Sequence, residues 1–261
     1  MRQSLLWIGS FAAIGSFAVL APTPTESQTR WHWPEKSENL KVLPEDTSSR
    51  KLRAIMSGFT RALGVRCEHC HVGEAGQSLS TFDFVSDENP NKNRAREMLR
   101  MLGSVNDHLD KIEPSGPERT NMWCHTCHHG TPRPMRLEEA LLETYASKGT
   151  EDAVNQYREL RERYYGRGAY DFGQASLNVV GYEMLGQGDV AGAREIFTIN
   201  TEQFPESPNT WDSLAEAHMI AGETERAIEL YEKVLQMDPE SQNARDMLAK
   251  LRGTGTEAVT E

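Results

Sequence analysis

The chain has 261 residues and a formal net charge of -11, so it can form two modest domains after an N-terminal leader. The charge is uneven, because residues 31–136 contain 15 Lys and Arg against 14 Asp and Glu, whereas residues 137–261 contain 11 against 24. A neutral region followed by an acidic region argues against nucleic acid as a partner.

Residues 1–21 have the layout of a secretory signal. Arg2 is followed by a mostly apolar run from Leu5 to Ala21, and Pro, Thr, Glu and Ser come soon after it. A run of this length, interrupted by glycine and serine, is also compatible with a thin membrane anchor. We therefore expect export to the periplasm, with the chain either soluble or anchored to the inner membrane by this segment.

Two amphipathic helices are predicted between residues 31 and 136. The first should begin after the capping cluster at 45–48 and end at Gly64, a residue type that tolerates the left-handed turn after a helix. Its apolar stripe consists of Leu52, Ile55, Met56, Phe59 and Leu63. The second helix should begin near Pro90 and end before Pro114. On that helix Met98 lies in the aliphatic stripe and is expected to fill core space.

Each predicted helix precedes one Cys-x-x-Cys-His motif, and the two motifs use all four cysteines. The first comprises Cys67, Cys70 and His71, and the second comprises Cys124, Cys127 and His128. This is the attachment sequence of c-type haem, in which the thiols bind the porphyrin and the histidine ligates the iron. A four-cysteine zinc site would place its pairs about 15–20 residues apart, whereas 53 residues separate Cys70 from Cys124. Disulfides would leave both histidines unexplained, so we predict two covalently attached haem c groups.

Methionines on the two helices are candidates for the sixth iron ligand. Met56 lies 11 residues before Cys67, and Met101 lies 23 residues before Cys124. At about 100° per residue, His108 projects from nearly the same side of the second helix as Met101 and is the alternative ligand. The basic residues Arg66, Lys92, Arg94 and Arg96 either neutralise haem propionates or belong to a solvated face.

Several segments of this region resemble the cytochrome c subunit of photosynthetic reaction centres. They are Asn39 to Pro44, Leu63 to Cys67, Phe84, Asp87 to Lys92, and Ala95 to Met101. That family repeats a unit in which a helix supplies a methionine and the following turn carries the Cys-x-x-Cys-His motif. The reaction-centre subunit resembles two pairs of such units holding four haems, and this chain matches one pair over about residues 39–134.

The resemblance implies a ligand set for each haem. It pairs His71 with Met56 for the first haem and His128 with Met101 for the second. It also implies redox proteins as partners, with a photosynthetic reaction centre among the candidates. Two positions depart from the family pattern: His129 stands where an arginine commonly follows the motif, and His108 is early for the histidine that ligates a distant haem.

The C-terminal half repeats with a period of 34 residues. At this shift Leu177 aligns with Trp211, Ala193 with Ala227, Phe197 with Tyr231, and Pro205 with Pro239. Small residues where the helices cross, an aromatic in the second helix and a terminal proline are typical of tetratricopeptide (TPR) repeats. A degenerate helix pair is expected before these repeats, and a capping helix after them. The repeats should dock a protein partner, mediate self-association or cap the haem region.

The predicted fold is therefore mostly α, with a small dihaem cytochrome c domain at 31–136 followed by a TPR α-solenoid at 137–252. Residues 253–261 are expected to be a disordered tail. With both irons six-coordinate, the chain should carry single electrons between protein partners rather than act as an enzyme. The alternative is a haem peroxidase or reductase with an open iron, served by His108, His129 or Asp107. A scaffold without haem is a third hypothesis.

Overall fold

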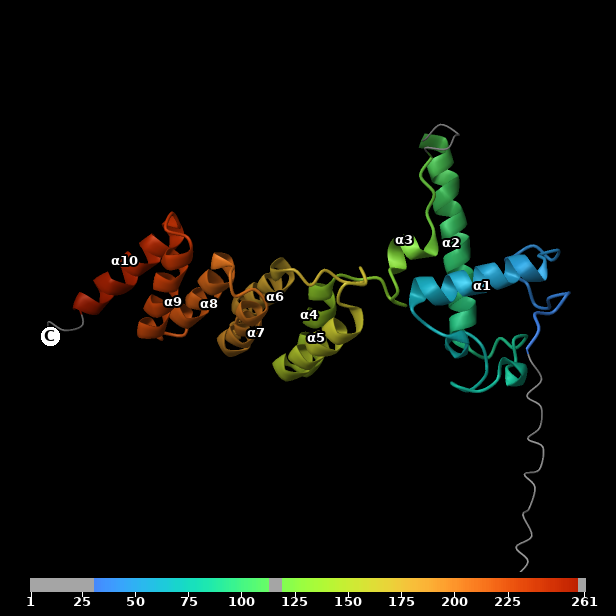
Figure 1. The fold of residues 1–261 in the computed structure, drawn as a ribbon, viewed down its shortest axis with the longest axis horizontal. Helices are drawn as coiled ribbons and strands as arrows, with labels where there is room; N and C mark the ends of the chain where they lie inside the picture. The colour runs from blue at the N-terminus through green and yellow to red at the C-terminus, as the bar shows by residue number, and fades with distance from the viewer. Residues whose placement is uncertain (1–30, 113–118, 258–261) are drawn as a thin grey trace, which may run out of the picture.

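The computed structural model describes residues 31–112 and 119–257, and the regular secondary structure of this part is helical apart from one isolated β-bridge between Val72 and Asp83. The predicted mostly α fold is confirmed (Figure 1). No helix within these ranges combines the length and apolar character needed to cross a bilayer. The predicted leader at 1–21 lies outside the described residues.

The N-terminal part contains three α-helices and two short 3₁₀ turns. Helix α1 spans Ser49–Leu63, α2 spans Pro90–Ile112 and α3 spans Cys124–His128. The 3₁₀ turns η1 and η2 span Cys67–His69 and Leu79–Thr81. Helix α2 crosses α1 and extends well beyond it (Figure 1), so one long helix is available to both cysteine motifs.

Helix α1 begins and ends where the sequence predicts. The Ser48 hydroxyl accepts a hydrogen bond from the backbone N–H of Lys51 at 3.4 Å, which caps the first turn. The helix ends at Gly64, whose φ of 65° lies in the left-handed region. Close by, the N–H of Gly130 donates to the carbonyl of Ala62 at 2.8 Å. The end of α1 therefore lies directly against the end of α3.

A Gly64→Ala substitution should destabilise the protein by at least about 1–2 kcal/mol, the usual cost of a left-handed non-glycine residue. A Cβ there would also lie 2.0 Å from the carbonyl oxygen of Gly130. Gly58→Ala, in the middle of α1 with no atom within 4 Å of the added Cβ, should be neutral or stabilising. The urea unfolding midpoints of the Gly64→Ala and Gly58→Ala variants test this prediction. Equal midpoints would contradict the close approach of Gly64 to Gly130.

The prediction that Met98 fills core space is wrong. This side chain is 41% exposed, and Val105 and Ile112 of the same apolar stripe are exposed as well. Their exposure means that no other part of the described chain covers this face of α2 at these positions.

The C-terminal part consists of stacked antiparallel helix pairs. Helices α4 (Leu137–Lys148) and α5 (Thr150–Tyr164) form the expected degenerate pair. The first full repeat is α6 (Gln174–Gly186) with α7 (Val190–Gln203), and the second is α8 (Pro208–Ile220) with α9 (Thr224–Met237). The capping helix is α10 (Gln242–Glu257). Helices α6, α8 and α10 begin at 174, 208 and 242, so their starts keep the predicted period of 34.

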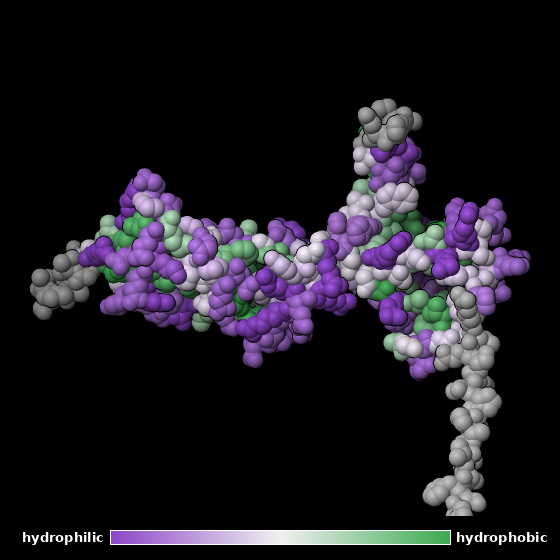
Figure 2. All heavy atoms as spheres, viewed as in Figure 1, coloured by the Kyte–Doolittle hydropathy of each residue, from purple (hydrophilic) through white to green (hydrophobic). Residues whose placement is uncertain are grey.

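One continuous apolar core runs through these helices. Leu141, Val180, Phe197, Leu230 and Leu248 are among its buried members. The outer surface is mostly hydrophilic in the view of Figure 2. Each helix pair thus buries its apolar face against the next pair, as a solenoid requires.

The end of α10 differs from the expected tail at 253–261. The helix continues to Glu257, and no proline between 253 and 257 interrupts it. Residues 258–261 lie outside the described residues.

Candidate functional site

A cavity of about 580 Å³ lies between α1, the first cysteine motif and the start of α2. Its lining includes Met56, Cys67, Cys70 and His71, which are all four residues predicted for the first haem. The volume falls within the range of roughly 300–1,000 Å³ that is usual for small-molecule and cofactor sites. Apolar side chains from α1, among them Phe59 and the buried Leu52, form much of the wall.

The first motif is held in place by its own backbone and by two asparagines. The N–H of His71 donates to the carbonyl of Cys67 at 3.0 Å, which closes the turn. Asn89 and Asn91 then donate their side-chain amides to the carbonyls of Glu68 and His69, at 3.2 and 2.9 Å. The start of α2 therefore clamps the residues between the two cysteines.

The His71 imidazole is suited to binding a metal ion. Burial, aided by the positive charges of Lys92 and Arg96, lowers its pKa to about 4, so the ring is neutral at physiological pH. Its Nδ1 is buried without a hydrogen-bond partner, which is a cost that a ligand in the cavity could relieve. The ring packs edge-on against Phe84 at a centroid distance of 4.9 Å.

Aromatic rings continue outward from Phe84 along the cavity wall. Phe82 stacks on Phe84 with a centroid distance of 5.7 Å, and the centroid of the Trp31 ring lies 4.7 Å from that of Phe84. Trp33 packs edge-on against Trp31 at 6.4 Å. Trp31 and Trp33 also line the cavity.

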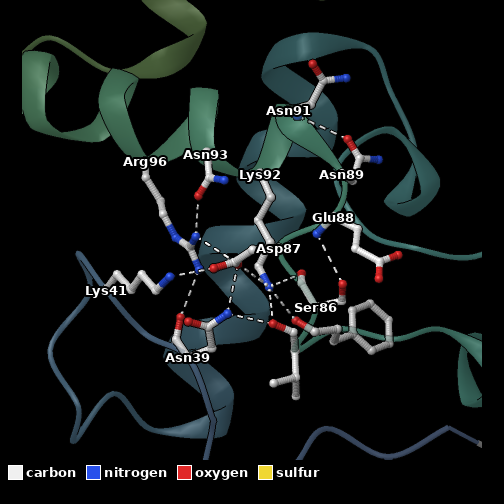
Figure 3. A network of polar contacts seen from close by, with 12 residues as sticks. Asn39, Lys41, Ser86, Asp87, Glu88, Asn89, Asn91, Lys92, Asn93 and Arg96 are labelled. Carbon is white, nitrogen blue, oxygen red and sulfur yellow. Dashed lines mark hydrogen bonds and ion pairs between the residues drawn. The ribbon is translucent and has the colours of Figure 1, made fainter.

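Asp87 is the centre of a polar network beside the cavity (Figure 3). Its carboxylate pairs with Lys41 at 2.5 Å, Arg96 at 2.8 Å and Lys92 at 3.3 Å. The Lys92 ammonium also donates to three backbone carbonyls at 84–86. These contacts join the loop before α2 to the segment at 39–41. Since Asp87 compensates Lys92 and Arg96, they act here as structural groups rather than as free partners for haem propionates.

The network should make stability depend on pH in the acid range. Hydrogen bonds from Lys41, and also from Arg96, Asn39 and Lys92, hold the pKa of Asp87 well below its ordinary value. A depressed carboxylate pKa stabilises the fold above the ordinary pKa, and the contribution is lost as the pH falls below about 4.

We therefore expect Asp87→Asn to unfold at a lower urea concentration than the wild type at pH 7, and to lose less stability on acidification. The half-buried Lys92 and the buried Arg96 would lack a carboxylate partner in this variant. Glu97→Gln, which removes an exposed pair with Arg100, should stay within about 0.5 kcal/mol of the wild type. Parallel pH profiles for wild type and Asp87→Asn would refute the assigned role.

The second motif forms the short helix α3. The Thr126 hydroxyl accepts a hydrogen bond from the N–H of Trp123 at 3.0 Å, and His129 ends the helix with a φ of 47°. His128 is buried, and its Nδ1 lies 2.9 Å from the carbonyl of Thr131. A hydrogen bond at Nδ1 leaves Nε2 as the nitrogen that can face an iron, the usual arrangement of a histidine ligand.

Helix α2 holds the second motif through Asn106. Its side-chain amide donates to the carbonyl of Met122 at 3.0 Å and accepts from the N–H of Met122 at 2.9 Å. Met101, the predicted sixth ligand, lies on α2 and is 51% exposed. The alternative ligand His108 is also exposed there, with Nδ1 at 2.8 Å from the carbonyl of Ser104. Both candidates for the sixth ligand of the second haem are therefore exposed, whereas the ligands predicted for the first haem line a cavity.

Some positioning residues were not predicted from the sequence. Asn89, Asn91 and Asn106 clamp the motifs to α2, and Thr131 orients His128. A local signal existed only for Asn89, since an asparagine before a proline is typical of a helix start. The other three act on residues that no sequence periodicity connects with them.

Comparison with known proteins supports both halves of this description. The family model of the photosynthetic reaction centre cytochrome C subunit matches residues 15–165, and a tetratricopeptide repeat model matches residues 208–251. Cytochrome c-554 of Chloroflexus aurantiacus is 28% identical in an alignment of 127 residues, and the match covers 42% of this chain and 28% of the relative. The match therefore spans less than a third of that relative's length.

Two solved TPR structures are similar to part of this chain. The first TPR of Spaghetti (RPAP3) bound to an HSP90 peptide has a TM-score of 0.33 at 15% identity, covering 46% of this chain and 90% of that chain. The second TPR domain of human RPAP3, in complex with an HSP70 peptide, has a TM-score of 0.32 at 16% identity, covering 44% and 92%.

The fold and the two motifs define a class, namely a helical cytochrome that carries protein-interaction repeats. Within that class the chain belongs to the photosynthetic reaction centre cytochrome C subunit family. Membership implies covalently bound haem c.

Proposed function

We propose that the protein is an exported dihaem c-type cytochrome that passes single electrons between redox protein partners, with its TPR repeats as a docking element. The observation that carries this proposal is the meeting of Met56, Cys67, Cys70 and His71 in one cavity. In this proposal the protein acts in the periplasm, soluble or tethered by its N-terminal segment. The apolar run from Leu5 to Ala21 supports this location.

The residues around the first cavity fit a haem c. Cys67 and Cys70 would hold it by thioether bonds, with His71 and Met56 as axial ligands. Haem c supplies a reversible one-electron couple between ferric and ferrous iron. The chain's own contribution is the apolar wall with Leu52, Phe59 and Phe84, which keeps water away. Low water access and a thioether ligand both favour a higher reduction potential.

A second haem on α3 is supported by the apolar side chains exposed around that motif. Trp123 is exposed next to Cys124, and Met101 and Val105 are exposed on α2. Such a concentration of exposed apolar surface is unusual for a soluble protein unless something covers it. Cys124 and Cys127 would bind this haem, with His128 as the proximal ligand and Met101 or His108 opposite.

Redox proteins are the proposed donor and acceptor, and a photosynthetic reaction centre is one candidate. The family relationship and the likeness to cytochrome c-554 support this class of partner. The cavity wall is mostly apolar, which suits an electron carrier better than a haem enzyme that needs acid–base groups beside its iron.

A spectroelectrochemical titration of the holoprotein tests the proposal. The expected result is two one-electron steps, with low-spin spectra in both oxidation states and no turnover of hydrogen peroxide. Titration of the Met101→Ala and His108→Ala variants would then identify the sixth ligand of the second haem. A high-spin ferric iron that turns over peroxide would instead support the haem enzyme.

A further inference from the structure

A ladder of polar side chains connects the first helices of successive repeats. The Asn178 amide donates to the side chain of Asn209 at 2.5 Å, which joins α6 to α8. The Tyr182 hydroxyl donates to Glu216 at 2.9 Å and lies 3.2 Å from Ser213, again between α6 and α8. These side chains therefore share one face of the solenoid.

A hollow of about 560 Å³ opens on this face. Its lining comprises Gln174, Ala175, Asn178, Val179, Tyr182, Glu183 and Asn209. Val179 and Tyr182 are large apolar side chains that remain exposed within it. The amides of Asn178 and Asn209 lie beside them and have hydrogen-bonding capacity left for a peptide backbone. The hollow thus offers both an apolar floor and polar groups suited to an extended segment.

The charge around the hollow is negative. Glu183 lines it, and Glu216 and Asp212 follow on the adjacent α8. No lysine or arginine is among the lining residues. Burial raises the pKa of Tyr182 to about 12, so its hydroxyl stays protonated and keeps the Glu216 carboxylate as its acceptor. Residues 137–261 carry 24 acidic against 11 basic residues, so the surrounding field has the same sign.

We infer that this hollow binds an extended, lysine- or arginine-rich segment of a protein partner. The aliphatic stem of one basic side chain would lie on Val179 and Tyr182, with its charge beside Glu183 and Glu216. Nucleic acid and anionic lipid carry the same sign as the hollow and are repelled. The inference rests on the proposed docking role of the repeats, and it specifies the chemistry of the partner.

Fluorescence anisotropy of the holoprotein tests the inference with a short labelled peptide of alternating lysine and alanine. The same peptide with glutamate in place of lysine serves as the negative probe. The double variant Glu183→Gln/Glu216→Gln should bind the lysine peptide about tenfold or more weakly than the wild type. The matched control Glu202→Gln/Glu206→Gln removes two exposed carboxylates outside the lining. Its affinity for the lysine peptide should stay within about twofold of the wild-type affinity.

Equal weakening in both double variants would overturn the inference, since it would mean diffuse attraction to an acidic surface. Failure of the lysine peptide to bind at low salt would also overturn it. A dimer seen by sedimentation and abolished by the Glu183→Gln/Glu216→Gln pair would assign the hollow to a second copy of the chain instead. The haem spectrum of each sample is recorded in parallel, so a failed peptide test is distinguishable from a failed cytochrome assignment.

Discussion

A Met56→Ala protein should retain its covalent haem at Cys67 and Cys70 but have a markedly lower reduction potential at that haem. The thioether favours ferrous iron, and its loss leaves a water or a weaker donor at the sixth position. Axial ligands set haem potentials over a range of roughly 0.8 V, so we expect a shift of a sizeable part of that range. Spectroelectrochemistry and the ferric absorption spectrum measure it.

Met184→Ala is the matched control for a methionine that only packs. Met184 is fully buried in the TPR core, so its truncation should cost about 2–5 kcal/mol of unfolding free energy without changing either potential. If Met56→Ala behaved in the same way, with lower stability and an unchanged spectrum, Met56 would be a core residue and the proposed ligand set would be wrong.

Phe197→Ala should remove about 3–5 kcal/mol from the stability of the repeats. The ring is fully buried in the apolar core and packs edge-on against Tyr182 at 5.2 Å. It also lies so close to α6 that a Cβ on Gly181 would be 2.4 Å from it. Urea unfolding followed by far-UV circular dichroism measures the loss, and the haem spectrum should be unchanged.

Ile220→Ala is the control for Phe197, because this side chain is exposed on α8. The Ile220→Ala substitution should change the free energy of unfolding by no more than about 0.5 kcal/mol relative to the wild type. Since each repeat is stabilised by its neighbours, the Phe197 variant should weaken the adjacent helix pairs as well. A Phe197→Ala protein as stable as Ile220→Ala would contradict the shared core of the helix pairs.

The sequence predicted the elements well wherever the signal was local. The capping serine and Gly64 delimited α1, and α2 begins at Pro90 as predicted. The period of 34 residues located the starts of α6, α8 and α10, because stacked helix pairs must repeat their packing residues at fixed spacing. Periodicity and capping act over a few residues and can be recognised without tertiary information.

Features that depend on long-range contact were not predicted. Asn91 and Asn106 bind backbone carbonyls of distant residues, and a polar residue on a helix has no pattern that reveals such a partner. Met98 was predicted as core because it continues an apolar stripe, but the side chains of that stripe are exposed at Met98, Val105 and Ile112. An amphipathic pattern identifies the apolar side of a helix, whereas the folded arrangement decides what covers it.

The four predicted residues of the first haem site illustrate the same division. Cys67, Cys70 and His71 follow from a motif whose spacing alone specifies the chemistry. Met56 was proposed from its helix and from family resemblance, and the structure brings it into the same cavity as the motif. For the second site, Met101 and His108 share an exposed face of α2, so the choice between them stays a prediction.

Haem stoichiometry tests the central claim most directly. The chain would be exported in a host able to attach c-type haem, and then examined by intact mass and by its pyridine haemochrome spectrum. We predict two covalent haems per chain, and one in each of the Cys67→Ser/Cys70→Ser and Cys124→Ser/Cys127→Ser variants. A folded product without covalent haem, or with one haem that only a single cysteine pair can hold, would contradict the dihaem assignment.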